Sequence, residues 1–177
     1  MGTDHSAVWV IAEQIDCHLQ SVSLQLTGQA RKLADQLQTS VEVILLGDNI
    51  EEPAHQLIAA GADRVYLANA PELEVYQPEP YTEIVVNLAT EHQPEIILIG
   101  STDMGRELAP LVAARLKTGL SAHCIDFVFD KDIILEQRIP AYGGLISILC
   151  PEKRPQMATS AKGVFPTPEP EDSRTGE

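Results

Sequence analysis

Short apolar runs alternate with segments of helical periodicity along most of the chain. The apolar runs occupy residues 7–12, 41–46, 64–67, 96–99 and 125–129. Helical spacing of apolar residues fills the intervals at 24–37, 53–60, 80–91 and 105–116. The first, second and fourth runs are apolar without alternation, which is typical of parallel strands covered on both faces. The pattern predicts strand–helix–strand units and therefore an α/β fold with a doubly wound, mostly parallel, Rossmann-like sheet.

Capping and stop residues set the expected ends of the helices. Ser21 or Ser23 can cap the first helix through its hydroxyl group. Pro53 suits the first position of the second helix, and Gly61 suits the position just past its end. Pro94 stops the third helix, because proline has no backbone N–H to donate.

The pattern changes after Asp130. Short β-like runs at 133–138, 145–149 and 157–159 are separated by turn residues and by no segment of helical length. They predict an antiparallel excursion on the edge of the parallel sheet. From Pro166 onward Pro, Glu, Ser and Gly dominate, so residues 166–177 are expected to form a disordered tail or linker. The sequence thus predicts one domain over 1–165.

Charge and cysteine content narrow the class of protein. The net charge of −14 disfavours nucleic acid and anionic membrane surfaces. The longest apolar runs are far below the ~18 residues that span a bilayer. The first six residues carry no basic cluster, which argues against a leader peptide. Three cysteines without a CxxC pair fit free thiols in a reducing compartment, so a cytoplasmic protein is expected.

The loop after the fourth apolar run is the first candidate site. It contains Gly100, Ser101, Thr102, Gly105 and Arg106 at the start of a helix, where unpaired amides can hold a phosphate. The alternative is that Ser101 or Thr102 caps the helix and Arg106 pairs with an acidic neighbour. The segment 13–21, after the first strand, would meet this loop at the switch point of the sheet.

Other chemistry is weaker in this sequence. Glu13 and Asp16 can bind a ribose or act as bases, or can simply be solvated loop residues. The Cys17-His18 and His123-Cys124 pairs lack metal-ligand spacing, so no metal site is predicted. No nucleophile, base and orienting acid come together, and the sequence predicts a protein that is not an enzyme.

A second cluster combines arginines, prolines and glycines with apolar strands. Its members are Arg138, Pro140, Tyr142, Gly143, Gly144, Arg154, Pro155, Gln156 and Met157. One interpretation is a strand–turn–strand that closes the domain edge. The other is a docking surface for a second domain, since Arg and Tyr are enriched at interfaces.

Taken in order, several of these segments resemble the N-terminal domain of the electron transfer flavoprotein α subunit. The matching residues are Val10–Glu13, Ala30–Ala34, Gly61–Val65, Gly100–Thr102, Gly105–Pro110, Ala113–Leu116, Pro140–Gly144 and Arg154–Thr159. The resemblance covers 7–165, and the runs 105–110 and 154–159 are specific together. Ile139, Leu145 and Ser160–Gly163 depart from the family pattern at the edge that would face a partner.

The resemblance implies an adenine-nucleotide-hydrolase-like fold that serves as a scaffold without catalytic residues. Such a domain pairs with a β-type subunit and seats an FAD domain, and the heterodimer takes electrons from dehydrogenases. FAD is then a cofactor of the complete complex and is not bound by this chain alone, and AMP belongs to the β-type partner. No flavin-binding segment follows Phe165 here, which implies a truncated chain or an FAD domain supplied in trans. The alternative is a stand-alone adenine-nucleotide-binding domain of the same fold.

Overall fold

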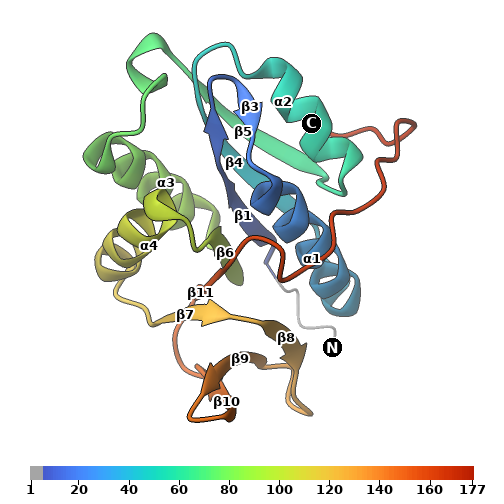
Figure 1. Ribbon diagram of the computed structural model, residues 1–177, viewed down its shortest axis with the longest axis vertical. Helices are drawn as coiled ribbons and strands as arrows, with labels where there is room; N and C mark the ends of the chain where they lie inside the picture. The colour runs from blue at the N-terminus through green and yellow to red at the C-terminus, as the bar shows by residue number, and fades with distance from the viewer. Residues whose placement is uncertain (1–5) are drawn as a thin grey trace.

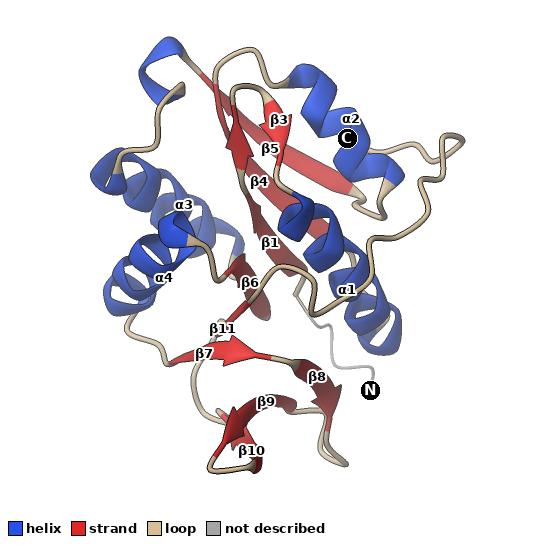
Figure 2. Cartoon of the chain, viewed as in Figure 1, coloured by secondary structure: helices blue, strands red, loops and turns tan. Residues whose placement is uncertain are grey.

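A six-stranded parallel sheet forms the centre of the computed structural model, which describes residues 6–177 (Figures 1 and 2). In spatial order its strands are β5 (Arg64–Asn69), β4 (Val41–Gly47), β1 (Val8–Ala12), β6 (Ile96–Gly100), β11 (Gln156–Ser160) and β7 (Leu120–Cys124). Every neighbouring pair is parallel. The predicted doubly wound α/β fold is therefore confirmed. Residues 1–5 lie outside the described residues. The expectation about a leader peptide and the start of the predicted 1–165 domain fall partly on them.

Four α-helices cover the two faces of this sheet, as Figure 1 shows. The first pair, α1 (Ser21–Leu37) and α2 (Glu51–Ala59), shares a core with Val8 and Val10 of β1. The second pair, α3 (Pro78–His92) and α4 (Asp103–Leu116), shares the opposite core with Trp9 and Ile11. Successive side chains of a strand point to opposite faces. Strand β1 is apolar at every position because both of its faces are covered.

The sheet differs from the prediction in two elements at its β11–β7 edge. The run at 157–159, expected in the antiparallel excursion, lies in β11, which is buried at all five positions between β6 and β7. The run at 125–129, expected in the parallel sheet, instead contributes β8 (Asp126–Phe129) to a separate sheet. Both assignments were wrong because the chain leaves the parallel sheet after β7 and re-enters it only at β11.

The excursion itself is confirmed as a three-stranded antiparallel sheet. Its order is β10 (Gly144–Leu149), β9 (Leu135–Ala141), β8. Leu135 and Gln137 of β9 are fully buried, and Ile139 packs against the same core as α1. One face of this sheet therefore closes the core at the end of the molecule opposite α2 (Figure 1).

The helix ends follow the predicted signals in part. Gly61 has φ +122°, a conformation that favours glycine, just past α2. Pro53 is the third residue of α2, since the helix begins at Glu51. Neither Ser21 nor Ser23 caps α1: the N-cap is Gln20, whose side chain makes no capping hydrogen bond. Ser23 Oγ instead accepts the Glu13 amide (2.7 Å) and donates to the Glu13 carbonyl (3.1 Å).

Residues 163–177, here called the strap, run without helix or strand across α1 and α2 to β5. Phe165 stacks on Phe127 with ring centroids 5.4 Å apart. Pro168 covers Gly28 in the middle of α1, where an added Cβ would lie 3.1 Å from the proline ring. The Glu177 carbonyl accepts the Val65 amide (2.8 Å), and the Glu177 amide donates to Asp63 (3.1 Å). The segment expected to be a disordered tail thus makes specific contacts with the domain.

Candidate functional site

The topological switch point lies between β1 and β6. The chain leaves β1 for β4 on one side, while β6 flanks β1 on the other, so the connections diverge at the carboxyl ends of these strands. A cavity of about 370 Å³ opens there. Its walls come from the hairpin of β2 (Gln14–Ile15) and β3 (His18–Leu19), from the loop before α3, and from the start of α4. Segments 13–21 and 100–106 meet at this place, as predicted from the order of strands and helices.

Glu13 is the buried ionisable group of this cavity. Glu13 is 4% exposed, and the Thr102 hydroxyl lies 2.9 Å from its Oε1 and 2.7 Å from its Oε2. Burial raises the pKa of Glu13 to about 7, and the Thr102 hydrogen bond opposes that shift. The interpretation of Glu13 as a solvated loop residue is wrong. Asp16, by contrast, lies exposed in the turn between β2 and β3.

The two glycines of the candidate loop provide close packing. A Cβ on Gly105 would lie 1.8 Å from the Gly100 carbonyl oxygen, so only glycine allows the first turn of α4 to approach the end of β6. A Cβ on Gly100 would lie 2.7 Å from a Glu13 carboxylate oxygen. Both positions therefore hold α4, β6 and Glu13 together.

The polar side chains of the loop are engaged within the domain. Thr102 is the N-cap of α4 and accepts the Gly105 amide at 3.0 Å. The Ser101 hydroxyl lies 2.9 Å from Nδ1 of His123. Arg106 forms an ion pair with Asp103. These are the contacts of the alternative interpretation, in which the loop caps a helix.

The charge of the cavity opposes a phosphate ligand. Four carboxylate side chains line it, those of Glu13, Asp16, Glu74 and Asp103, and its lining contains no Lys or Arg. The Glu13 carboxyl group sits where the N-terminus of α4 would otherwise attract an anion. Nucleotide phosphates and the diphosphate of FAD would meet like charge here, so the residues of this cavity do not fit either group.

The Cys-His pairs are separate features of the surface. Cys17 Sγ donates to the Asp48 carbonyl at 3.3 Å, and His18 Nδ1 lies 2.6 Å from the Asp16 carbonyl. Cys124 is buried, and its neighbour His123 is exposed. Across residues 6–177, no group of three His, Cys, Asp or Glu side chains is placed to hold a metal ion.

The second predicted cluster divides into an exposed and a buried part. Pro140, Tyr142, Gly143 and Gly144 lie exposed at the end of β9, in the turn and at the start of β10. Half-buried Arg138 donates to Asp126 and Glu136, each at 3.0 Å. Hydrogen bonds from Ser147 and then Arg138 lower the pKa of Glu136. This part of the cluster therefore lies at the surface of the domain.

The other part belongs to the interior of the domain. Pro155, Gln156 and Met157 are buried at the entry to β11, and Gln156 and Met157 are each 1% exposed. Arg154 is exposed but is tied to Glu95 by an ion pair and to three backbone carbonyls. Including the three buried residues in a docking surface was wrong, because side chains inside the sheet cannot contact a partner.

Sequence reasoning missed the apolar residues of β10 itself. Leu145 is 60% exposed, Ile146 41% and Leu149 46%. The register pairs Leu145 with Pro140 and Ser147 with Arg138, on the face opposite buried Gln137. Strand β10 pairs only with β9, so its outer edge is open among the described elements. The apolar run at 145–149 was visible in the sequence, but its exposure was not.

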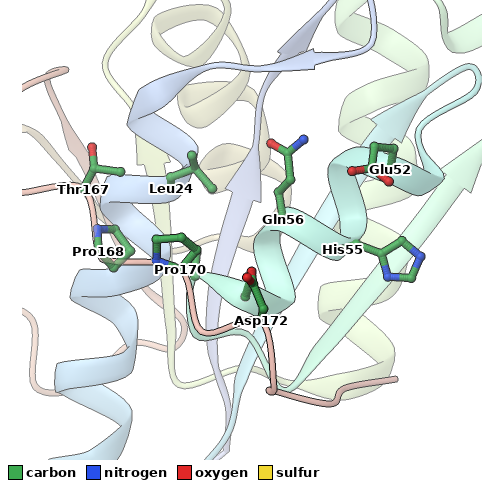
Figure 3. Close-up of a pocket in the computed structure, with 10 residues that line it drawn as sticks. Leu24, Glu52, His55, Gln56, Thr167, Pro168, Pro170 and Asp172 are labelled. Atoms are coloured by element: carbon green, nitrogen blue, oxygen red, sulfur yellow. The ribbon is translucent and has the colours of Figure 1, made fainter.

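A second cavity of about 370 Å³ lies between the strap, α1 and α2 (Figure 3). The strap contributes Thr167, Pro168, Pro170 and Asp172 to its wall. This cavity is a consequence of how the strap crosses the two helices.

These observations define a Rossmann-like α/β domain. Its switch-point loop is engaged by its own side chains, and its added antiparallel sheet ends in the exposed strand β10. The sequence model of the electron transfer flavoprotein domain family matches residues 8–177, and the chain belongs to that family. The match includes the strap as well as the sheet.

The chain is similar to α subunits of the family in particular. It is 42% identical over 175 residues to the electron transfer flavoprotein subunit alpha of Thermoanaerobacterium thermosaccharolyticum, covering 98% of this chain and 53% of that protein. The Megasphaera elsdenii subunit alpha is 43% identical, with 98% and 52% covered. Subunit LctC of a lactate dehydrogenase (NAD(+),ferredoxin) from Acetobacterium woodii is 36% identical, with 93% and 40% covered. The chain spans about half the length of the two α subunits and 40% of LctC. The resemblance drawn from the sequence is confirmed.

Proposed function

We propose that this domain is a scaffold of an electron transfer flavoprotein: it pairs with a β-type subunit and seats an FAD domain that exchanges electrons with dehydrogenases. Membership of the family and similarity to its α subunits support this role. The observation that carries the pairing is the exposed, apolar edge strand β10. An open edge with large apolar side chains is a template for association with another chain.

The proposed pairing surface has the anatomy of an interface. Leu145 and Leu149 provide apolar area on one face of β10, and Tyr142 lies fully exposed at the turn beside them. The Arg138, Glu136 and Ser147 network lies between them on the same face, since its members are joined by hydrogen bonds across β9 and β10. Apolar anchors around a fixed polar group are typical of a specific contact.

The domain itself supplies no electron carrier in this proposal. The carboxylates at the switch point disfavour FAD, so the flavin belongs to a separate FAD domain, in cis or in trans. Dehydrogenases then act as electron donors to the complex and do not need a site on this chain. No helix in the described part of the chain is long and apolar enough to cross a membrane. The three free cysteines support a cytoplasmic setting.

Co-expression with a β-type subunit from the same source tests the pairing. The tagged wild-type chain should retain the subunit through gel filtration. The double variant L145S/L149S should weaken retention at least about tenfold, because each removes an exposed apolar anchor. Leu67→Ser is the matched control, since Leu67 is 43% exposed on β5, away from β9 and β10. Failure of the wild type to bind refutes the pairing, and equal binding by both variants refutes the role of β10.

The alternative function, adenine-nucleotide binding, has weaker support in the geometry. Gly100, Ser101, Thr102, Gly105 and Arg106 lie at the switch point, but all are used in packing, capping or pairing. In this proposal AMP belongs to the β-type partner. Calorimetry with AMP and ATP should give no binding heat up to millimolar ligand, and a saturable signal would favour the alternative.

A further inference from the structure

Two loops carry exposed apolar residues at the carboxyl edge of the parallel sheet. Ile15, in the β2–β3 hairpin, is 60% exposed, and Val75, in the loop between the short 3₁₀ helix η1 (Pro71–Leu73) and α3, is 70% exposed. Both residues line the switch-point cavity. Apolar side chains beside a cavity with polar groups are a candidate interaction surface.

The acidic lining of the same cavity determines which charge a bound group can carry. Asp103, one of its four acidic residues, is paired with Arg106, and the lining contributes no Lys or Arg to face the other three, Glu13, Asp16 and Glu74. His18 lies on the same hairpin with Nδ1 against the Asp16 carbonyl. A cationic group fits this lining, whereas a phosphate or carboxylate is repelled.

Glu13 gives the cavity a specific acceptor. A carboxylate has about four acceptor positions. The side-chain donor that reaches Glu13 among the described residues is the single Thr102 hydroxyl. The remaining acceptor capacity belongs to a side chain that is 4% exposed and lines the cavity. A forked donor such as a guanidinium group satisfies buried carboxylate oxygens well.

We propose that this carboxyl-edge surface, formed by Ile15, Val75 and the acidic cavity between them, is a second protein-docking site that receives an arginine or lysine side chain flanked by an apolar residue of a partner protein. The apolar neighbour packs on Ile15 and Val75, and the cation enters the cavity. The net charge of −14 accelerates the approach of such a partner.

The site is independent of the proposed pairing through β10. In Figure 1, β3 lies at the end of the molecule opposite β10, so both surfaces are open at once. A basic protein can therefore dock at the carboxyl edge while another subunit occupies the antiparallel sheet. This inference does not rest on the proposed function, and it fails or stands separately.

A charge-matched pair of small probes tests the site on the chain as it is. N-acetyl-leucyl-arginine amide is titrated into ¹⁵N-labelled protein at low salt, with N-acetyl-leucyl-glutamine amide as the neutral control. The expected result is saturable shifts of the amides of Ile15, Val75 and their loop neighbours with the arginine probe alone. Raising the salt to about 0.3 M should weaken the binding several-fold, because exposed charges are screened.

Variants separate the apolar and the acidic contributions. I15S/V75S should weaken binding of the arginine probe at least about fivefold, as should D16N/E74Q. L67S and E169Q/E171Q are the matched controls and should leave it unchanged. All the substituted side chains are exposed, and spectra that stay unchanged outside the loops verify folding. Absent binding, equal binding of the glutamine probe, or shifts centred away from these loops would each overturn the proposal.

Discussion

Replacing Glu13 with glutamine should change how the stability of the domain depends on pH. In the wild type, burial raises the pKa of this carboxyl group from the ordinary 4.5 to about 7. The folded state therefore holds the proton more tightly than the unfolded state does. Unfolding releases that proton between these two pH values, so raising the pH favours unfolding. The stabilising contribution is complete below pH 4.5 and is lost as the pH rises through 7.

The magnitude follows from the size of the pKa shift. Each pKa unit corresponds to ~1.36 kcal/mol, so the wild type should lose about 3 kcal/mol from this group between acidic and mildly alkaline pH. Glutamine has no charge to desolvate and keeps an oxygen that accepts from the Thr102 hydroxyl, which now contacts both carboxylate oxygens. Glu13→Gln should therefore lack this loss, and its stability relative to the wild type should rise with pH.

Urea unfolding followed by circular dichroism measures the effect. The free energy of unfolding is determined for both proteins at pH 5, 6, 7 and 8, and the difference between them is plotted, which cancels groups that titrate alike in both. Glu74→Gln is the control, because Glu74 lines the same cavity but is exposed. The pH-dependent difference from the wild type should be larger for Glu13→Gln than for this control. A difference for Glu13→Gln that is constant with pH, or that falls as the pH rises, contradicts the buried-carboxyl argument.

Three further predictions concern packing and the strap. Gly105→Ala should cost at least about 3 kcal/mol in urea unfolding because its Cβ meets the Gly100 carbonyl, whereas Gly119→Ala, whose Cβ has 3.6 Å of clearance, should be near neutral. Gly28→Leu should push Pro168 off α1, and hydrogen exchange should then show lost protection at the Val65 amide but not within β1. Burial alone would raise the pKa of Asp63, but the Val41 amide, Arg31 and Arg174 outweigh it and lower that pKa. Asp63→Asn should therefore reduce the melting temperature at neutral pH, and the reduction should become smaller as the pH falls below 3.8.

The sequence predicts the central strands and the four helices because their signals are local. Strand β1 is buried on both faces, and its uninterrupted apolar run follows directly from that. The errors concern β11, expected in the excursion, and the run at 125–129, whose expected place in the parallel sheet is taken by β7. The positions of β11 and β7 depend on contacts distant in sequence. Strand β7 contains Ser121 and His123, and β11 contains Gln156 and Thr159, so neither forms a continuous apolar run. Their place in the sheet is set by pairing across the excursion, which periodicity does not report.

The candidate loop shows a different limit of sequence reasoning. Its location at the switch point was predictable, since it follows from the order of strands and helices. The role of its residues was not, because it depends on Glu13, which lies far away in the chain yet reaches Thr102. One signal was present: Glu13 directly follows a strand buried on both faces, so it begins inside the molecule. A carboxylate in that position competes with any anionic ligand for the helix N-terminus.

The strap illustrates how composition misleads when a few residues dock individually. Its Pro- and Glu-rich sequence cannot build a core of its own, and that composition led to the expectation of disorder. Docking needs only a seat on an existing surface. Gly28 is part of that seat, since a glycine inside a helix costs about 1 kcal/mol relative to alanine and here leaves room for Pro168. Arg174 and Arg31 converge on Asp63 and fix the far end of the strap.

The closed loop and the open surfaces are consistent with each other as features of a scaffold. A domain that binds a nucleotide keeps polar groups unpaired until the ligand arrives, and that costs stability. Here Thr102, Arg106 and Ser101 already have partners, and Gly105 locks α4 onto β6. What remains exposed is apolar area on β10 at one end and on the carboxyl-edge loops at the other. Apolar area of that kind contributes free energy when a protein surface covers it, which supports the proposed scaffold role over the binding of a small anionic ligand.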